Sequence, residues 1–377
     1  MDEGGRENHD LTEKTMVMRG GVIAEPVLQI GHYLSFSENG ATRRLRIGPS
    51  GITIGRLATC DISFPVQEIS RQHCRVQTEG FGVSLVDLGS TNGTFIGGRR
   101  IERPMAVDHG GSFTVGSNVV RYERRDEREV AEEARLNSEL RQAVEYVRAI
   151  LPEPISTGPV QAEWWYVPSS ELGGDAFGYQ FLDDTTVFGF LLDVSGHGIG
   201  AGLHAANVAT VLRRRALPGV DFSDPGAVAS ALNTMFPMEE HGGLMFTMWY
   251  FTFRTDTHSL RYCAAGHHAA FLASPVEPDA IALWQRAPSI GMLPARNWPT
   301  AEMTLPADSR LYLFSDGAFE IIERDGTAWQ IDNLRHVIGA GPTQGLGEAQ
   351  RLYQAVRAAA KPGPLDDDFS TLVLHFA

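Results

Sequence analysis

A glycine-free stretch, residues 121–154, divides the chain into two parts of different character. It is rich in Glu, Arg and Ala, and it ends with Pro152 and Pro154. This composition predicts one long helix, because glycine and proline are the residues that most destabilise a helix interior. At 377 residues the chain is long for a single hydrophobic core, so we expect the helix to join two domains.

Apolar residues follow a heptad spacing along the second half of this predicted helix. They lie alternately four and three residues apart: Leu136, Leu140, Ala143, Val147 and Ile150. The seam covers about two repeats, fewer than a coiled coil usually needs. Two interpretations are therefore open. The helix packs its apolar face on its own domain, or it forms a coiled coil and hence a homodimer.

The segment before the helix, residues 26–123, is a series of short alternating or β-branched runs separated by Gly, Asn, Ser and Pro. Helical periodicity is absent from it, and the pattern is typical of a compact all-β sandwich. Residues 1–25 are polar and contain glycine, so we expect a flexible N-terminal tail. We place the helical linker at 124–152 and a second domain at 153–377.

The second domain mixes strand-like and helix-like segments. Apolar runs typical of strands surround predicted helices at 199–216, 225–236 and 345–360. Strands mostly in hairpin order, with helices kept apart from them, predict an α+β fold with sheet packed on sheet and helices outside.

The charge balance limits the classes of partner. The formal net charge is −14, which argues against nucleic-acid or anionic-membrane binding, because phosphate contacts need clustered Lys and Arg. No apolar run is long enough to span a membrane. The three cysteines, Cys60, Cys74 and Cys263, form no CxxC pair or even-numbered framework. With an acidic N-terminus unlike a signal peptide, these features predict a cytoplasmic protein.

Four aspartates of the second domain each stand where a hydrophobic strand-like run ends in glycine or polar sequence. They occur in the segments GGDAF, FGFLLDVSGHG, LYLFSDGAFE and DDDFSTLVLHF, at positions Asp175, Asp193, Asp316 and Asp367. A carboxylate at a strand end is held by the sheet and stays open to a ligand, and hard divalent cations prefer oxygen donors. Asp193 follows the apolar run FGFLL, where an unpaired carboxylate would cost several kcal/mol to bury. The pattern therefore predicts one divalent-metal site.

Three motifs of the first domain point to phosphate recognition. Arg56 follows a strand-like run, the sequence SRQH occupies 70–73, and STNGT occupies 90–94. All three belong on loops, from which Arg56, Ser70, Arg71 and Thr91 could offer the cationic and hydroxyl donors that a phosphate needs. Asn92 carries both a donor and an acceptor and suits a peptide backbone.

These motifs closely resemble those of the forkhead-associated (FHA) domain over about 100 residues. The resemblance implies an eleven-stranded sandwich that binds phosphothreonine, with Arg56, Ser70 and Thr91 around the phosphate and Asn92 on the peptide backbone. It also implies that His73 holds the loops in place.

The second domain resembles the metal-dependent protein phosphatases (PPM, protein phosphatase 2C group), in their bacterial stage II sporulation E branch. The matching elements occur in the family's order over residues 150–377: ILPEP, GGDAF, DVSGHG, AAGHHAAFL, PSIGMLP, LYLFSDGAFE and DDFSTLVL. The resemblance implies an αββα sandwich with two Mn²⁺ or Mg²⁺ ions. Their ligands would be Asp175, Asp193, the carbonyl of Val194, Asp316 and Asp367.

The same resemblance implies hydrolysis of phosphoserine or phosphothreonine by a metal-activated water. Asp193 would be essential to catalysis, and His197 would protonate the leaving oxygen or else shape the glycine turn. We expect His267, by contrast, to be a core histidine. The chain departs from the family pattern at Gly178, where many members carry an acid, and it has no arginine before GGDAF.

The sequence therefore predicts a bacterial protein phosphatase whose FHA domain targets or regulates it. By the resemblance, its partners would be phosphoproteins such as anti-sigma-factor antagonists, and proteins of a Ser/Thr kinase pathway. Two alternatives stay open: an inactive phosphopeptide-binding scaffold, and a hydrolase of small phosphoesters.

Overall fold

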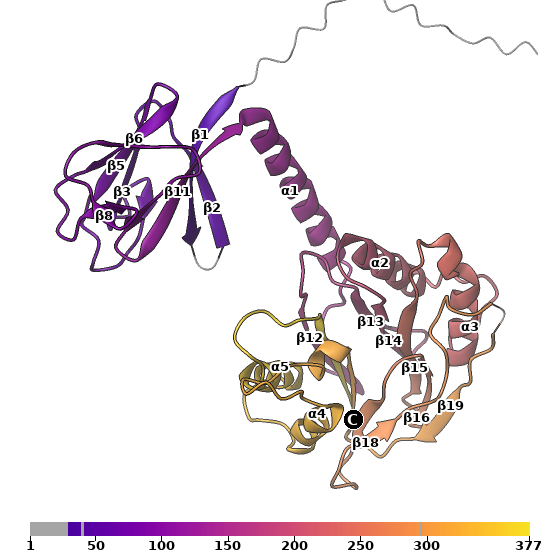
Figure 1. The fold of residues 1–377 in the computed structure, drawn as a ribbon. Helices are drawn as coiled ribbons and strands as arrows, with labels where there is room; N and C mark the ends of the chain where they lie inside the picture. Colours follow the sequence, from indigo (N-terminus) through magenta and orange to yellow (C-terminus); the bar gives the residue numbers. More distant parts are fainter. Residues whose placement is uncertain (1–28, 39–40, 295) are drawn as a thin grey trace, which may run out of the picture. The chain divides into compact units, whose positions relative to one another are not determined.

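A computed structural model describes residues 29–38, 41–294 and 296–377. The predicted tail, residues 1–25, lies outside the described residues. The chain divides between Ser138 and Glu139 into two compact units, which are described separately below (Figure 1).

The N-terminal unit is a sandwich of eleven strands in a six-stranded and a five-stranded sheet. The first sheet has the order β2-β1-β11-β10-β7-β8: β1 (Ile30–Glu38), β2 (Ala41–Arg46), β7 (Thr94–Ile96), β8 (Arg99–Arg100), β10 (Ser112–Val115) and β11 (Asn118–Asp126). The second has the order β4-β3-β5-β6-β9: β3 (Ile52–Gly55), β4 (Ile62–Ser63), β5 (Cys74–Glu79), β6 (Gly82–Asp87) and β9 (Met105–Val107). Inward-facing apolar residues of both sheets, among them Leu34, Ile54 and Val120, form one core. The predicted all-β sandwich is confirmed.

Helix α1 (Glu127–Arg148) is shorter than the helix predicted over 121–154. Residues up to Asp126 belong to β11, because β11 pairs with β1 from Val120 opposite Phe36 to Asp126 opposite Ile30. These ladder hydrogen bonds outweigh the helix propensity of the charged sequence. The first turns of α1 are then tied to neighbouring strands by ion pairs of Glu133 with Arg44 and Arg125.

The apolar seam of α1 is only partly covered within one chain. Leu136 is 54% exposed, whereas Leu140, Ala143 and Val147 are half-buried. Val144, which lies off the seam, is the buried residue of the helix. Both interpretations of the seam, packing on its own domain and self-association, therefore stay open.

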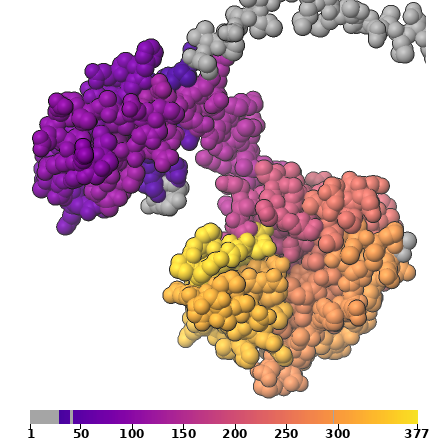
Figure 2. All heavy atoms as spheres, in the orientation of Figure 1, coloured from indigo at the N-terminus to yellow at the C-terminus, as the bar shows by residue number. Residues whose placement is uncertain are grey.

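The C-terminal unit contains two five-stranded antiparallel sheets that face each other. The first has the order β13-β14-β15-β16-β19: β13 (Asp175–Phe181), β14 (Thr186–Val194), β15 (Phe246–Arg254), β16 (Ser259–Ala265) and β19 (Ala301–Thr304). The second has the order β12-β21-β20-β17-β18: β12 (Val160–Val167), β17 (Ala270–Ala273), β18 (Ile281–Leu283), β20 (Ser309–Phe314) and β21 (Phe369–Phe376). Figure 2 shows segments from the beginning and the end of this unit side by side, as the pairing of β12 with β21 requires.

Apolar side chains point alternately to the two faces of the strands, and they form three apolar layers. Phe188 and Phe190 of β14 face helices α2 (Ile199–Arg213) and α3 (Pro225–Met235), whereas Leu191 faces the second sheet. On the far side of that second sheet, Tyr312 packs toward α4 (Ile331–Gly339) and α5 (Glu348–Ala359). The order helices, sheet, sheet, helices confirms the predicted αββα arrangement, visible in Figure 1.

The sequence missed several short elements of this unit. Helix α4 has nine residues and begins with a capping box between Gln330 and Asn333, which the apolar pattern alone does not reveal. Strands β18 and β19 are short edge strands. Two 3₁₀ turns, η1 (Met238–Glu240) and η2 (Asp316–Ala318), complete the described elements. No helix in the described part of the chain is both long and apolar enough to cross a bilayer.

Candidate active site and phosphopeptide site

Two of the four predicted aspartates lie opposite each other in the first sheet of the C-terminal unit. Asp175 is the first residue of β13 and Asp193 is the last but one of β14, and the register pairs them directly. The beginning of one antiparallel strand lies beside the end of the next, which is why positions 18 residues apart meet. Side chains alternate between the two faces of a strand, so both aspartates point to the same side as Phe177 and Leu191, which face the second sheet.

The other two aspartates occupy the corresponding end of the second sheet. Asp316 follows β20 and opens the turn η2, while Asp367 stands two residues before β21. β20 and β21 are antiparallel partners, with Phe314 opposite Thr371. The interpretation that all four follow a strand is thus correct for Asp193 and Asp316, whereas Asp175 and Asp367 stand at strand beginnings.

A cavity of about 370 Å³ opens where the two sheets bring these ends together. It is lined by candidate residues from both sheets and by their neighbours: Ser169, Ser170, Asp193, Val194, Ser195, Gly196, His197, Asp316, Asp366 and Asp367. Asp175 does not line it. That carboxylate is 6% exposed and accepts a hydrogen bond of 2.6 Å from the hydroxyl of Ser370.

Burial and mutual repulsion raise the pKa of three of these carboxylates. Burial and the charges of Asp316 and Asp367 raise the pKa of Asp193 to about 7. Burial and then Asp367 raise the pKa of Asp316 to about 6. Burial, followed by the charge of Asp193, raises the pKa of Asp175 well above its ordinary value. None of the ion pairs among the described residues involves any of the four, so their charge is not compensated by a lysine or arginine.

The donor set fits a divalent cation in its chemistry. Carboxylate and carbonyl oxygens are the ligands that Mg²⁺ and Mn²⁺ prefer, and the uncompensated charge favours a cation. Gly174 leaves the Val194 carbonyl accessible, since a Cβ atom there would come within 3.0 Å of that oxygen. Within the described ranges, no three His, Cys, Asp or Glu side chains already have metal-coordinating spacing. The fit is therefore one of donor type and charge, and not of a finished coordination shell.

Asp368 is a buried residue of this site that the sequence did not single out. Its carboxylate accepts hydrogen bonds from the Ser169 amide (2.7 Å), the Ser169 hydroxyl (2.8 Å) and the Gly174 amide (2.6 Å). Its carbonyl accepts from the hydroxyl of Ser315, which also receives the amide of Ser370. This network joins the start of β13 to the end of β20 and the start of β21. The run of three aspartates hid it, because such runs are usually solvated.

Replacing Asp368 with alanine should weaken both the fold and the binding of Mn²⁺. The buried amide of Gly174 and the half-buried amide of Ser169 would lose their acceptor, which we expect to cost about 2–4 kcal/mol in the free energy of unfolding. Mn²⁺ affinity should fall about 10- to 100-fold, since the network orients the carboxylates. Denaturant titration and calorimetry with Mn²⁺ measure the two effects. The exposed Asp184, in the turn between β13 and β14, mutated to alanine, is the control, and an equal loss in both variants would contradict the orienting role.

His197 lines the cavity and is exposed. It stands between Gly196 and Gly198, whose φ angles of 86° and 85° lie in the region that favours glycine, just before helix α2. Both expected roles, proton donor and turn residue, are consistent with this position. His267 is 4% exposed and burial lowers its pKa, which agrees with a core histidine.

The predicted phosphate-binding residues of the N-terminal unit lie on three loops joined through Ser70. The amide of Arg56 donates to the Ser70 carbonyl (2.9 Å), and the amide of Thr91 donates to the Ser70 hydroxyl (3.0 Å). The side chains of Arg56, Arg71 and Thr91 are exposed. Asn92 is also exposed, and its amide donates to the carbonyl of Glu68 (2.7 Å).

His73 holds these loops from inside. It is fully buried, accepts the Ser70 amide at Nδ1 (3.1 Å) and donates from Nε2 to the Gly93 carbonyl (3.0 Å). Gly55 lets the first loop approach the second, because a Cβ atom there would overlap the Arg71 carbonyl. The exposed side chains of Arg56 and Arg71 are thus attached to loops that these contacts hold rigid.

Comparison with protein families supports both resemblances. Residues 183–377 match the family model described as stage II sporulation protein E (SpoIIE), and residues 52–116 match that of the FHA domain. The chain is 28% identical over 174 residues to phosphoserine phosphatase RsbP of Bacillus subtilis (strain 168). The match covers 45% of this chain and 42% of RsbP, so it spans less than half of that relative.

Solved structures show the fold of the C-terminal unit. The SiaA-PP2C domain of Pseudomonas aeruginosa superimposes with a TM-score of 0.55 at 17% identity, covering 66% of this chain and 99% of that domain. The PP2C phosphatase domain of SpoIIE from Bacillus subtilis, solved with a fragment of its regulatory domain, gives 0.50 at 16% identity, covering 59% and 64%. At these identities the similarity concerns the fold alone.

Proposed function

Because the chain belongs to the stage II sporulation protein E (SpoIIE) family, we propose that it is a metal-dependent serine/threonine protein phosphatase carrying a phosphothreonine-binding FHA domain. The observation that carries the proposal is the placement of four carboxylates at one end of two facing sheets. The pKa is raised at Asp175, Asp193 and Asp316, and none of the four has a basic partner among the residues that the structure describes. A site of this charge favours cations, and a phosphate monoester is dianionic, so divalent ions are needed between the two.

We propose that two Mn²⁺ or Mg²⁺ ions are held by Asp175, Asp193, the Val194 carbonyl, Asp316 and Asp367. When bound, such ions polarise a phosphoryl oxygen and lower the pKa of water to near neutrality. The protein's own contribution is to hold the carboxylates on rigid strand ends. Asp175 keeps its orientation through the Ser370 hydroxyl, and the start of β13 keeps its position through Asp368.

The proposed role of His197 is to act on the leaving group. It is exposed and lines the cavity that Asp193 and Asp316 also line, so it is open to a phosphoserine or phosphothreonine entering from solvent. We propose that its imidazole gives a proton to the departing serine or threonine oxygen.

We propose that the FHA domain chooses the partner. Arg56 and Arg71 present two guanidinium groups, and Ser70 and Thr91 add hydroxyl donors around the same loops. Phosphothreonine would be held by charge-assisted hydrogen bonds to this set, with Asn92 on the peptide backbone. The substrate would be a phosphoserine or phosphothreonine protein; RsbP is named for phosphoserine, and anti-sigma-factor antagonists and kinase-pathway proteins are the candidate partners.

The linker offers a route for regulation. The carbonyl of Ile150, just after α1, accepts a hydrogen bond from Arg213 of α2, and a small cavity touches both Ile150 and Asp175. We propose that phosphopeptide binding alters the packing of α1, by homodimerisation along its seam or within one chain, and so alters the metal site. Turnover and oligomeric state that stay unchanged at saturating phosphothreonine peptide would rule this out.

The test of the main proposal is phosphate release from a phosphoserine or phosphothreonine protein with Mn²⁺, with Mg²⁺ and with chelator. Release that needs the metal supports the phosphatase. Metal binding without turnover on any phosphoprotein would favour an inactive scaffold. Faster release from mononucleotides than from phosphoproteins would favour a hydrolase of small phosphoesters.

Metal stabilisation should depend on pH. The folded, metal-free protein holds Asp193 and Asp316 at a raised pKa, so the stability these groups give it is present at low pH and is lost as pH rises from about 4 to about 7. At higher pH, where the carboxylates are ionised, bound Mn²⁺ relieves the repulsion between them. At lower pH, Mn²⁺ must compete with the protons that these carboxylates hold. The rise in Tm caused by Mn²⁺ should therefore be larger at about pH 8 than at about pH 5.5. Thermal unfolding with Mn²⁺ and with chelator measures it, and an equal rise at both pH values would contradict it.

A further inference from the structure

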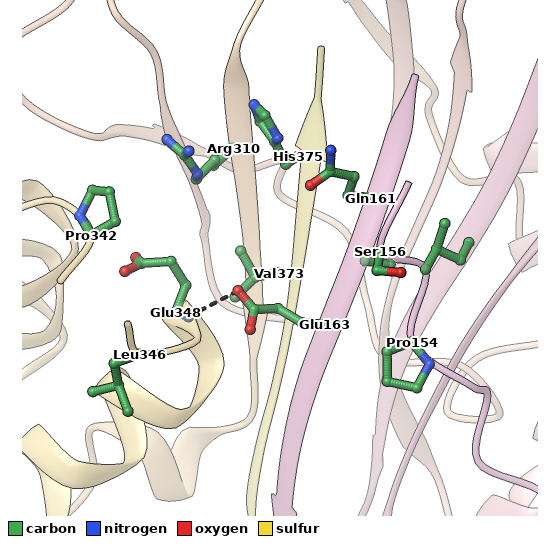
Figure 3. Close-up of a pocket in the computed structure, with 12 residues that line it drawn as sticks. Pro154, Ser156, Gln161, Glu163, Arg310, Pro342, Leu346, Glu348, Val373 and His375 are labelled. Carbon is green, nitrogen blue, oxygen red and sulfur yellow. Dashed lines mark hydrogen bonds between the residues drawn. The ribbon is translucent and has the colours of Figure 1, made fainter. Parts of the chain in front are cut away.

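A second cavity, of about 360 Å³, lies on the outer face of the second sheet (Figure 3). The four aspartates belong to the opposite, inner side of the sheet pair. Strands β12, β20 and β21 form the floor of this cavity. Its walls are the segment Pro154 to Ser156, which follows the linker, and the connection between α4 and α5 at Pro342 and Leu346. It is separate from the candidate active site.

A row of three polar side chains crosses the floor. Gln161 of β12 pairs with His375 of β21, which in turn pairs with Arg310 of β20. Their strand neighbours, such as Ala162 and Leu374, face the core between the sheets, so the three side chains face outward. Figure 3 shows Arg310, His375 and Gln161 next to one another along one end of the cavity.

Two side chains of this row, Arg310 and His375, carry nitrogens that make no hydrogen bond to any described residue. The guanidinium of Arg310 is half-buried and acts on Glu163 and Glu348 through electrostatic attraction, with no hydrogen bond or ion pair to any described residue. Nε2 of His375 is buried without a hydrogen bond, and the nearest carboxylate oxygen, on Asp308, is 3.4 Å away. Donors of this kind are normally satisfied in a folded protein.

The next row of the sheet, in contrast, is satisfied by helix α5. The Glu348 amide donates to Glu163 (2.8 Å), the Tyr312 hydroxyl donates to Glu348 (2.8 Å), and Arg351 binds Glu348 through two nitrogens at 2.7 and 2.8 Å. Helix α5 begins at this row and leaves the row of Arg310 uncovered. Glu163 accepts the amides of Glu348 and Ala349 at the start of α5, and its carboxylate, which can accept further hydrogen bonds, borders the cavity. The cavity therefore has a cationic end and an accepting side.

We propose that this cavity binds a small molecule that carries an oxyanion, either a carboxylate or a phosphate, and a hydroxyl or amino group. The oxyanion would lie on Arg310 and His375, where the planar guanidinium offers two parallel donors. The hydroxyl or amino group would donate to Glu163. The volume is in the lower part of the range of about 300–1,000 Å³ that small-ligand sites occupy. Hydroxy acids, amino acids and phosphate esters of small alcohols have this chemistry, and the proposal does not depend on phosphatase activity.

Methyl-labelled NMR of the full-length protein tests the proposal, with L-malate, L-aspartate and glycerol 3-phosphate as probes. Methyl groups of Ile155, Leu346 and Val373 line the cavity, and Val194 reports on the candidate active site. We expect at least one probe to shift the three cavity methyl groups saturably and to leave Val194 unmoved. Comparing the shifts caused by malate and aspartate with those caused by glycerol 3-phosphate shows whether the cavity binds a carboxylate or a phosphate.

The variant Arg310→Met should weaken that probe's affinity about 10- to 100-fold, the effect of losing hydrogen bonds to a charged group. Arg254→Met is the matched control, because Arg254 is an exposed arginine on another sheet, paired with Asp256. Unchanged cavity-methyl spectra in Arg310→Met without probe would show that the fold is kept. No saturable shift with any probe, shifts confined to Val194, or equal affinity in both variants would overturn the proposal.

Discussion

The variant Asp193→Asn should lose phosphate release almost entirely, by about a thousandfold, down to the rate with chelator. Asp193 lies directly opposite Asp175 in the first sheet of the C-terminal unit. The charges of Asp316 and Asp367, at the end of the second sheet, also contribute to its raised pKa. Asparagine keeps the shape and removes the charge, so it also removes repulsion from the metal-free protein. We therefore expect activity to fall while the Tm measured with chelator stays equal or rises.

Asp183→Asn is the matched control for this experiment. Asp183 lies in the turn between β13 and β14, where it accepts hydrogen bonds from Thr185 and Thr186 that an amide oxygen can also accept. It should keep full activity. Both phosphate release and Mn²⁺ affinity are measured, so that loss of catalysis is separated from loss of metal. A variant at Asp193 with more than a tenth of normal turnover would contradict the assignment of this residue.

A carboxylate-rich site could be predicted from the sequence because an apolar run followed by aspartate and glycine is a local pattern typical of a strand end. Asp193 follows FGFLL and Asp316 follows LYLF, so each was placed at a strand end before any contact was known. Motif order along the second half then identified the family, and the family match covers 183–377. The fold class predicted from the sequence is therefore confirmed, and the four aspartates that the sequence singles out lie at one end of the two facing sheets.

The remainder depends on contacts that have no local signature. Asp368 and Asp366 are the same residue type in the same run but have different surroundings. Asp368 is 5% exposed and accepts a hydrogen bond from the Gly174 amide, whereas Asp366 forms an ion pair with Lys361 at the surface. That difference comes from the meeting of β13 with β21, which lie in different sheets. The boundary of α1 was missed for a related reason, because pairing with β1 keeps residues up to Asp126 in a strand despite their helical composition.

The second large effect concerns the N-terminal unit: Arg56→Ala should weaken binding of a phosphothreonine peptide about 10- to 100-fold. The amide of Arg56 is fixed by Ser70, so its exposed side chain starts from a rigid point beside Thr91. Alanine keeps that backbone hydrogen bond and removes the exposed side chain beyond Cβ, including the guanidinium. The fold should therefore be unaffected, and calorimetry with the phosphorylated and unphosphorylated forms of one peptide measures the loss.

Arg121→Ala provides the comparison, since Arg121 is an exposed arginine in the middle of β11, within the same unit and outside the three loops. It removes the same charge, so any long-range electrostatic contribution to peptide binding appears equally in both variants. A phosphoserine version of the peptide adds a second contrast, because the resemblance implies a preference for phosphothreonine. Equal weakening in Arg56→Ala and Arg121→Ala would mean that net charge, and not the loop site, attracts the peptide. A loss confined to Arg56→Ala, and only for the phosphorylated peptide, would place the phosphate at this residue.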